Sequence, residues 1–244
     1  MEEIAVLCLQ ELRRMGVRTE VIRDFETVSE LMEGLGRPLS GANDPQKLLM
    51  TRANSFWVAG YSNDKETGKD KIVIGGGVRV DDLREESAQA FVGRSIGVLF
   101  GTKATAVEDA SFEHQYWGRA AYVGSLTSNL ATGLGRQSRF AVQLIMAYTH
   151  YRAFIEFGSE VNYCFLRQGD HSKAVTYGFM NAGCFPWRTE KPMYQDGNPG
   201  WLMTTRRDQL PSLMLSASRI IDQRLGVDDQ LFPRIKVNNS AGGK

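Results

Sequence analysis

The sequence predicts an α/β (α+β) fold in which helices flank a central β-sheet. Three observations lead to this prediction. Residues 120–165 combine a strand-like segment, a glycine-containing turn, a long helical segment and a second strand, in that order. Residues 55–63 and 71–80 have strand character and flank a polar segment, which is typical of a β-hairpin. Both ends of the chain place apolar residues at helical spacing.

The composition is that of a globular protein without a strong charge bias. Of the 244 residues, 42% are hydrophobic and 23% are charged, and the formal net charge is +1. We expect a single domain over residues 1–236 and a disordered tail over 237–244. A nucleic-acid surface normally needs a clustered excess of Lys and Arg, so no nucleic-acid partner is predicted.

Cysteine use and hydropathy give expectations about the environment of the protein. Cys8, Cys164 and Cys184 cannot all pair, and none has metal-ligand spacing, so no metal is expected. This use of cysteine favours a reducing, cytoplasmic location. The N-terminus lacks the long apolar core of a signal peptide. No run approaches the roughly 18 apolar residues that a membrane span needs.

The N-terminal part is predicted to form a helix, a strand, a short helix and the hairpin. Helical spacing covers residues 2–15 and again 27–35, and the strand covers 18–22. Within the hairpin, Gly75, Gly76 and Gly77 contribute no side chain to strand packing. Two interpretations remain open. The glycines permit close approach of a ligand or a bulge, or they permit a twist that lets another element pack closely.

The sequence patterns that predict secondary structure are less regular in the later segments. Residues 88–101 predict a helix turning into a strand, and residues 108–119 are polar and aromatic. Three prolines, at 186, 192 and 199, predict an excursion before a strand at 201–205. Residues 210–225 have the apolar face of a final helix.

The turn before the central helix has the features of an anion site. Gly133 and Gly135 permit a tight turn, and the helix that follows leaves backbone N–H groups unpaired at its positive end. Arg136 and Arg139 at the helix entrance add charge-assisted donors for a phosphate. Neither GxxxxGK[ST] nor GxGxxG is present, so the P-loop and the dinucleotide fingerprint lack support.

Several of these segments together resemble the GNAT acyltransferase superfamily. Residues 132–137, TGLGRQ, resemble its pyrophosphate turn, although Thr132 and Gln137 depart from the usual residues. Residues 163–165 resemble its second, splayed strand. Gly183 and Phe185 resemble the Gly-Phe pair that ends a further helix. The run SRFAV at 138–142 is similar to acyl-homoserine-lactone synthases and related N-acyl amino acid synthases.

The resemblance implies a central mixed, mostly antiparallel sheet with two splayed parallel strands. It implies direct transfer of an acyl group from acyl-CoA or acyl carrier protein to a primary amine, with no permanently bound cofactor. Two alternatives stay open. One is an N-acyl amino acid or autoinducer-type synthase using long-chain acyl carrier protein, and the other is a noncatalytic GNAT-like ligand-binding domain. The oligomeric state is not predicted.

Candidate site residues follow from the resemblance and from residue chemistry. A roughly 35-residue insertion over 81–118 carries candidate bases for the acceptor amine, namely Glu108, Asp109, Glu113 and His114. Tyr177 is a candidate acid for the leaving thiolate, and its alternative is a half-buried packing tyrosine.

Donor and substrate contacts complete the expected site. The donor contacts are Leu126, Thr127, Ser128, Gly133, Leu134, Gly135, Arg136, Gln137, Ser138 and Arg139. The substrate contacts are Arg79, Trp117 and Tyr163. Arg79 is equally expected as a surface or ion-paired arginine. Residues 36–46 are expected to form part of the wall of the acceptor site.

Overall fold

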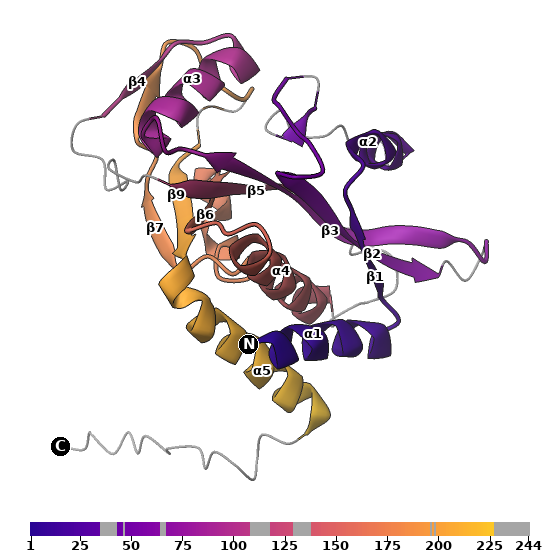
Figure 1. Cartoon of the computed structure of the whole chain (residues 1–244). Coiled ribbons are helices and arrows are strands. Elements are labelled where there is room, and N and C mark those ends of the chain that lie inside the picture. The colour runs from indigo at the N-terminus through magenta and orange to yellow at the C-terminus, as the bar shows by residue number, and fades with distance from the viewer. Residues whose placement is uncertain are drawn as a thin grey trace, which may run out of the picture.

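The computed structural model describes residues 1–34, 43–45, 47–63, 67–107, 118–128, 138–195, 197 and 199–226. Its centre is a seven-stranded sheet in the order β1-β2-β3-β5-β6-β9-β7 (Figure 1). The strands are β1 (Arg18–Ile22), β2 (Ser55–Asn63), β3 (Asp70–Asp82), β5 (Arg119–Ser128), β6 (Val161–Leu166), β9 (Trp201–Arg206) and β7 (Asn181–Cys184). Every neighbouring pair is antiparallel except β5 and β6, which are parallel. The predicted fold class is confirmed.

Helices cover both faces of the sheet. α1 (Glu2–Arg14), α4 (Ser138–Ile155) and α5 (Leu210–Leu225) pack together on one face, which we call the α4 face. α2 (Phe25–Gly34) and α3 (Ala88–Phe100) lie on the opposite face, which we call the α3 face (Figure 1). Beside α3, β4 (Ala104–Ala106) and β8 (Trp187–Thr189) form a second, two-stranded sheet. Among the described residues, no helix is both long and apolar enough to cross a membrane.

Local sequence signals explain where the helices begin and end. The Ser87 hydroxyl caps α3 by accepting a hydrogen bond from the backbone N–H of Ala90, and Gly101 ends the helix with a left-handed φ of 60°. Proline in the first turn starts α5, and Gly226 ends it with a φ of 71°. These signals agree with the periodicity of the apolar residues, so sequence and structure give the same boundaries for α5.

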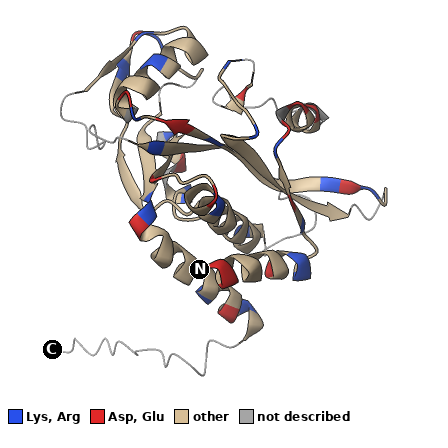
Figure 2. Cartoon of the chain, in the orientation of Figure 1, with Lys and Arg blue, Asp and Glu red and all other residues tan. Residues whose placement is uncertain are grey.

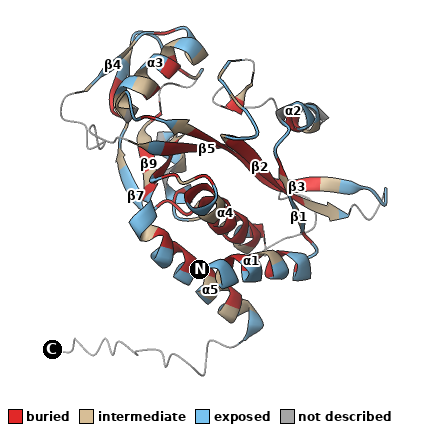
Figure 3. Cartoon of the chain, viewed as in Figure 1, coloured by how far each residue is buried: buried red, intermediate tan, exposed pale blue. Residues whose placement is uncertain are grey.

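The core lies on both sides of the sheet. α4 is buried along most of its length between the sheet and the other two helices of its face (Figure 3). On the α3 face, one apolar cluster lies beneath α3 and includes Tyr122 and Tyr163, and another lies beneath α2 and includes Trp57. Basic and acidic residues are interspersed on the described surface (Figure 2), in agreement with the net charge of +1.

The three glycines of β3 are explained by packing. The indole of Trp57 crosses the strand, so a Cβ at Gly75 would lie 2.6 Å from its Nε1 atom and a Cβ at Gly77 would lie 2.9 Å from its Cε3 atom. A Cβ at Gly76 would lie 2.7 Å from Leu126 Cδ2 on the other side of the sheet. The register of β3 with β5 also shifts between Gly75 and Gly77, so a bulge accompanies the close packing.

Two predictions of secondary structure were wrong. The strand expected at the end of residues 88–101 does not form, because the apolar side chains continue at helical spacing to the Gly101 cap and pack on the sheet. The helix expected before Gly183 is replaced by the short 3₁₀ helix η3 (Gln168–Lys173) and a turn, in which Gly178 has a φ of 78°. Gly183 itself lies in β7, whose backbone pairs with β9. The predicted tail, 237–244, lies outside the described residues.

Candidate functional site

The two parallel strands of the sheet separate after a short paired stretch. β5 pairs with β6 from Ala120 to Tyr122, opposite Val161 to Tyr163, and the two strands form no further pair. Both continue beyond this point, since β5 extends to Ser128 and β6 to Leu166. The outer neighbours hold them apart, because β5 stays paired with β3 and β6 with β9. Beyond Tyr122 and Tyr163, the inner edges of the two strands therefore do not pair with each other.

A bulge distorts β5 on one side of this gap. Ser125 has a φ of 51°, and no other non-glycine residue in the described ranges has a positive φ. Such a conformation is costly for a residue with a Cβ atom and is often found at functional sites. The side chain of Asn43, from the segment after α2, donates a hydrogen bond of 3.2 Å to the Ser125 hydroxyl. This contact ties the segment that precedes β2 to the bulge.

Part of the predicted donor site lies within the described residues. Leu126, Thr127 and Ser128 form the end of β5, and Thr127 and Ser128 pair with Gly75 and Ile74 of β3. Ser138 and Arg139 occupy the first turn of α4, where Ser138 is buried and Arg139 is exposed. The turn residues Gly133, Leu134, Gly135, Arg136 and Gln137 lie outside the described residues. The candidate bases Glu108, Asp109, Glu113 and His114, and the predicted contact Trp117, also lie outside them.

An apolar cavity of about 100 Å³ lies on the α3 face at the point where β5 and β6 separate. Tyr122 and Tyr163, the last residues to pair across the two strands, form part of its wall. The remaining lining residues come from β3, β6, α3 and the segment after β8, and they are Arg79, Val92, Ser95, Ile96, Leu99, Phe100, Phe165, Met193 and Tyr194. The cavity thus combines one polar wall with aliphatic and aromatic surface.

Arg79 supplies the charged wall of this cavity and is 2% exposed. Its Nε atom lies 3.0 Å from both carboxylate oxygens of Asp81, and its Nη2 atom lies 3.0 Å from Asp81 Oδ2. The guanidinium also lies 5.9 Å from the ring centre of Phe91 and 6.0 Å from that of Tyr122. Arg79 is therefore an ion-paired arginine, as one interpretation expected, and it also lines the cavity.

Burial shifts the pKa values of Asp81 and of the two tyrosines. Burial raises the pKa of Asp81, and this effect exceeds the lowering by the Arg79 charge. Burial also raises the pKa values of Tyr122 and Tyr163. Both phenols therefore stay protonated at neutral pH, which leaves their hydroxyl groups able to donate hydrogen bonds.

A larger groove of about 510 Å³ meets the cavity at Arg79, which lines both spaces. The groove lies between α3 and the segment before β2, and Leu49 of that segment is 79% exposed. Its acidic lining residues are Asp81, Asp82 and Glu86, and its other basic residues are Arg94 and Arg119. The groove thus carries both signs of charge and opens from the α3 face.

Tyr177 lies away from this cavity. It occupies the turn after η3, is half-buried, and packs against the core of the α4 face. Its backbone oxygen accepts a hydrogen bond of 2.9 Å from His150 Nε2, and His150 Nδ1 accepts one of 2.9 Å from Asn162 Nδ2. Burial raises the pKa of Tyr177. The geometry shows a packing role for this tyrosine, and the predicted acid role is kept as a proposal.

Sequence reasoning missed much of the cavity. It singled out Arg79 and Tyr163 but not Asp81, Tyr122 or α3. One sequence signal could have indicated Asp81. Arg79 and Asp81 are two positions apart in a mostly buried strand, so their side chains point to the same face of β3.

Comparisons with known proteins find similarity among solved structures. No family model matches the sequence, and no curated protein is significantly similar to it. Among solved structures, the fold is similar to the crystal structure of NAA60 from Arabidopsis thaliana in complex with acetyl-CoA, with a TM-score of 0.45 and 11% sequence identity over 78% of this chain and 98% of that chain.

Proposed function

We propose that the protein is an N-acyltransferase of the GNAT type, which moves an acyl group from a thioester donor directly to a primary amine. The observation that carries this proposal is the separation of β5 and β6 after Tyr122 and Tyr163. A pantetheine arm is an extended chain with amide groups, so it can lie between two separated strands and hydrogen-bond to their backbones much as an added strand does. The sequence resemblance to the superfamily supports the same interpretation.

The start of α4 is the proposed site for the donor phosphates. Unpaired N–H groups and the positive end of the helix dipole favour an anion there. Arg139 is exposed in this first turn, and its guanidinium can add a charge-assisted contact. Ser138 and the turn residues Gly133 to Gln137 complete the proposed phosphate contacts.

The proposed reaction is a direct transfer. The amine nitrogen attacks the thioester carbon, the C–N bond forms, and the C–S bond breaks with its electron pair on sulfur. One proton leaves the amine, and one protonates the thiolate. Backbone N–H groups between Leu126 and Ser128 are proposed to stabilise the oxyanion. Glu113 or His114 is proposed as the base and Tyr177 as the acid.

The nature of the acyl group follows from the space available. The alternative of a long-chain acyl carrier protein donor requires apolar volume beside the separated strands. The α3-face cavity lies there, but its volume is about 100 Å³. A dry cavity of about 150 Å³ binds a ligand of the size of benzene, so a cavity of about 100 Å³ cannot enclose a long acyl chain, whichever substrate group occupies it. We therefore propose a short-chain acyl donor in a cytoplasmic setting, consistent with the free thiols of Cys8, Cys164 and Cys184.

Ligand-induced thermal stabilisation tests the donor. Acetyl-CoA, a long-chain acyl-CoA and an acylated carrier protein are compared at equal concentration, since a ligand that binds the folded state raises the melting temperature. We expect the largest rise with a short-chain acyl-CoA. Thiol release with a panel of amines then tests turnover. Donor binding without thiol release would instead support a noncatalytic ligand-binding domain, and no binding of any thioester would refute the proposal.

A further inference from the structure

We propose that the α3-face cavity and the groove that meets it at Arg79 form the acceptor site, and that the acceptor is a primary amine carrying a compact apolar group. This inference rests on the proposed acyl transfer and names its acceptor class. The apolar group would lie against α3, and the nitrogen would point toward the place where β5 and β6 separate.

Direct transfer requires two separate entrances. Donor and acceptor must be bound at the same time, so the acceptor cannot enter through the opening that the donor fills. The proposed donor site lies at the strand gap and the start of α4, and α4 packs on the face opposite α3 (Figure 1). The groove opens on the α3 face and shares Arg79 with the cavity. The groove therefore reaches the Arg79 side chain that also lines the cavity, and the acceptor is proposed to approach from this side.

The lining of the cavity selects an apolar group. Among the described lining residues, Arg79 alone carries a formal charge, and Asp81 compensates that charge at 3.0 Å. Because Arg79 is already paired with Asp81, a further charged group would gain little binding free energy there. An apolar group gains binding free energy when it leaves water. The volume of about 100 Å³ limits this group to roughly the size of a branched four- or five-carbon chain.

The groove wall carries carboxylates that a cation can contact, beside an equal number of arginines. The carboxylates of Asp82 and Glu86 lie at its wall, each hydrogen-bonded to a neighbouring arginine, Arg84 and Arg94. A protonated amine can replace the arginine in such an exposed ion pair at a small cost in free energy, because exposed pairs contribute little to stability. Asp81 lies further in, at the junction with the cavity, where burial raises its pKa. An ammonium group would thus pass carboxylates before it reaches the buried junction.

A series of amines with one donor tests the acceptor class. We expect kcat/KM for thiol release to be at least tenfold higher with isobutylamine or isopentylamine than with ethanolamine, because burial of one or two methylene groups is worth about this factor. Tryptamine, which exceeds the cavity, should be a poor acceptor. Equal kcat/KM values across the series would overturn the inference.

Two substitutions in neighbouring positions of α3 locate the site. Leu99 lines the cavity, so Leu99→Phe fills it and should reduce kcat/KM for isopentylamine at least tenfold. Val98 is 59% exposed on the same helix, so Val98→Phe is the matched control and should leave kcat/KM unchanged. Leu99→Ala should improve the use of tryptamine. If Leu99→Phe is unstable, Val92→Ile tests the same cavity by adding one methylene group to its lining.

Donor measurements separate this inference from the proposed function. The melting-temperature rise caused by acyl-CoA should be the same in wild type, Leu99→Phe and Val98→Phe. If Leu99→Phe instead changes the preferred acyl length and affects all amines equally, the cavity holds the acyl group and the inference is wrong. If wild type binds the donor without turnover, the proposed function fails. The acceptor site is then tested by the rise in melting temperature that isopentylamine causes without a donor. Leu99→Phe should abolish this rise. A rise that persists in Leu99→Phe would refute the inference.

Discussion

The ring of Tyr122 folds back along its own strand and lies over Gly124. A Cβ at position 124 would lie 2.3 Å from Tyr122 Cε1 and 2.9 Å from the tyrosine oxygen. Glycine at 124 therefore allows Tyr122 to line the cavity just beyond the last β5–β6 pair. Because Gly124 has no side chain, the ring of Tyr122 can take this position in the candidate site.

This relationship predicts the effect of Gly124→Ala. The added methyl group must displace the buried ring of Tyr122, so the free energy of unfolding should fall by about 1–3 kcal/mol. Gly97 of α3 is the control, because a Cβ there would lie at an ordinary van der Waals distance, 3.7 Å, from Thr102 O. Gly97→Ala should be neutral or stabilising by up to about 1 kcal/mol. Urea denaturation of both variants measures the difference, and equal free energies would contradict the role of Gly124.

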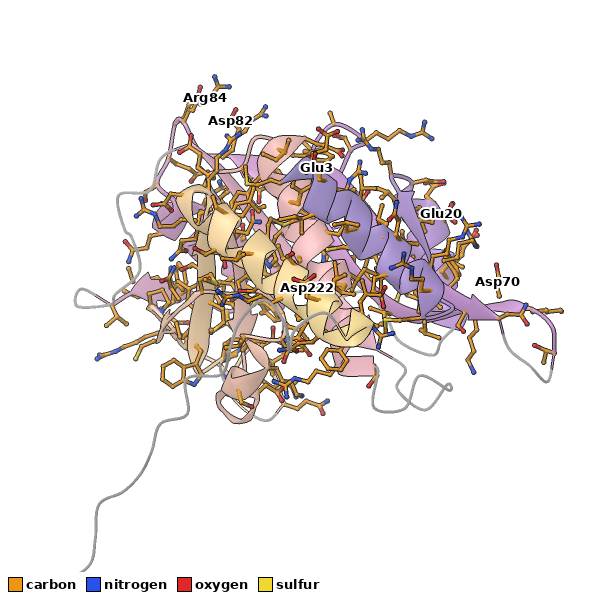
Figure 4. All side chains as sticks on the ribbon, turned by 90° about the horizontal axis from the view of Figure 1, so that it is seen from below. Glu3, Glu20, Asp70, Asp82, Arg84 and Asp222 are labelled. Atoms are coloured by element: carbon orange, nitrogen blue, oxygen red, sulfur yellow. The ribbon has the colours of Figure 1, made fainter. Side chains whose placement is uncertain are left out.

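Asp81 and Asp82 form a matched pair for testing the buried ion pair. Asp81 pairs with Arg79, whose side chain is 3% exposed, whereas Asp82 pairs with Arg84, whose side chain is 78% exposed. Figure 4 shows Asp82 and Arg84 together at the surface. Asp81→Asn should cost on the order of 2–4 kcal/mol because it leaves a guanidinium uncompensated in a buried site. Asp82→Asn should cost less than about 1 kcal/mol, since exposed pairs contribute little.

The comparison is made by chemical denaturation at neutral pH. A similar loss in both variants would mean that the Arg79–Asp81 pair has no special energetic role. Asp81→Glu provides a further check, because it keeps the carboxylate and should restore part of the lost stability.

His150 predicts a pH dependence of stability. It is fully buried between Asn162 and the Tyr177 carbonyl, and burial lowers its pKa to about 4 from an ordinary value near 6.5. The unfolded chain therefore binds a proton first as the pH falls. Stability should decrease from about pH 6.5 until the folded state is also protonated near pH 4, by up to about 3 kcal/mol in total.

His150→Gln isolates this contribution, since the other titrating groups remain the same. Free energies of unfolding are measured between pH 4 and 7.5 for both proteins. The variant should be less stable than wild type at pH 7, and the gap should narrow toward pH 4. Parallel pH curves would show that His150 does not titrate as its burial indicates.

The elements that could be predicted from the sequence are those whose apolar residues recur at regular helical spacing. Residues 210–225 have an apolar face, an early proline and a following glycine, and each signal predicts the same helix. Residues 88–101 and 168–180 carry weaker or conflicting signals, and tertiary packing decided their structure. The left-handed backbone of Ser125 had no sequence signal, because glycine or asparagine usually takes that conformation.

The cavity could not be predicted for a different reason. Its walls come from Arg79, the 92–100 segment, Tyr122, the 163–165 segment and residues 193–194, which meet through sheet order and helix packing. No spacing along the chain encodes those contacts. The proposed anion site at the start of α4 depends on local features instead, namely a strand, a glycine-containing turn and a helix in the sequence, and it stays a prediction.

Tyr177→Phe tests the proposed acid. If Tyr177 protonates the leaving thiolate, thiol release should fall at least tenfold with unchanged donor binding. The loss should be smaller with a donor whose thiol has a lower pKa, because such a leaving group needs less proton transfer. Tyr177 packs against the core of the α4 face, so a melting-temperature measurement must show that the variant keeps its fold. Unchanged thiol release would assign Tyr177 to packing alone.

Arg139→Ala tests the proposed phosphate site at the start of α4. Arg139 is exposed in the first turn, so its loss should leave the fold unchanged and weaken acyl-CoA binding about tenfold or more. The contact is electrostatic, so the difference from wild type should shrink as salt is raised. Arg219 on α5 is also exposed and provides the charge-matched control, Arg219→Ala. A thioester of pantetheine, which lacks the nucleotide and its phosphates, should bind wild type and Arg139→Ala equally. If Arg139→Ala weakens both donors alike, Arg139 does not act through the phosphates, and the donor must lie differently on β5 and α4.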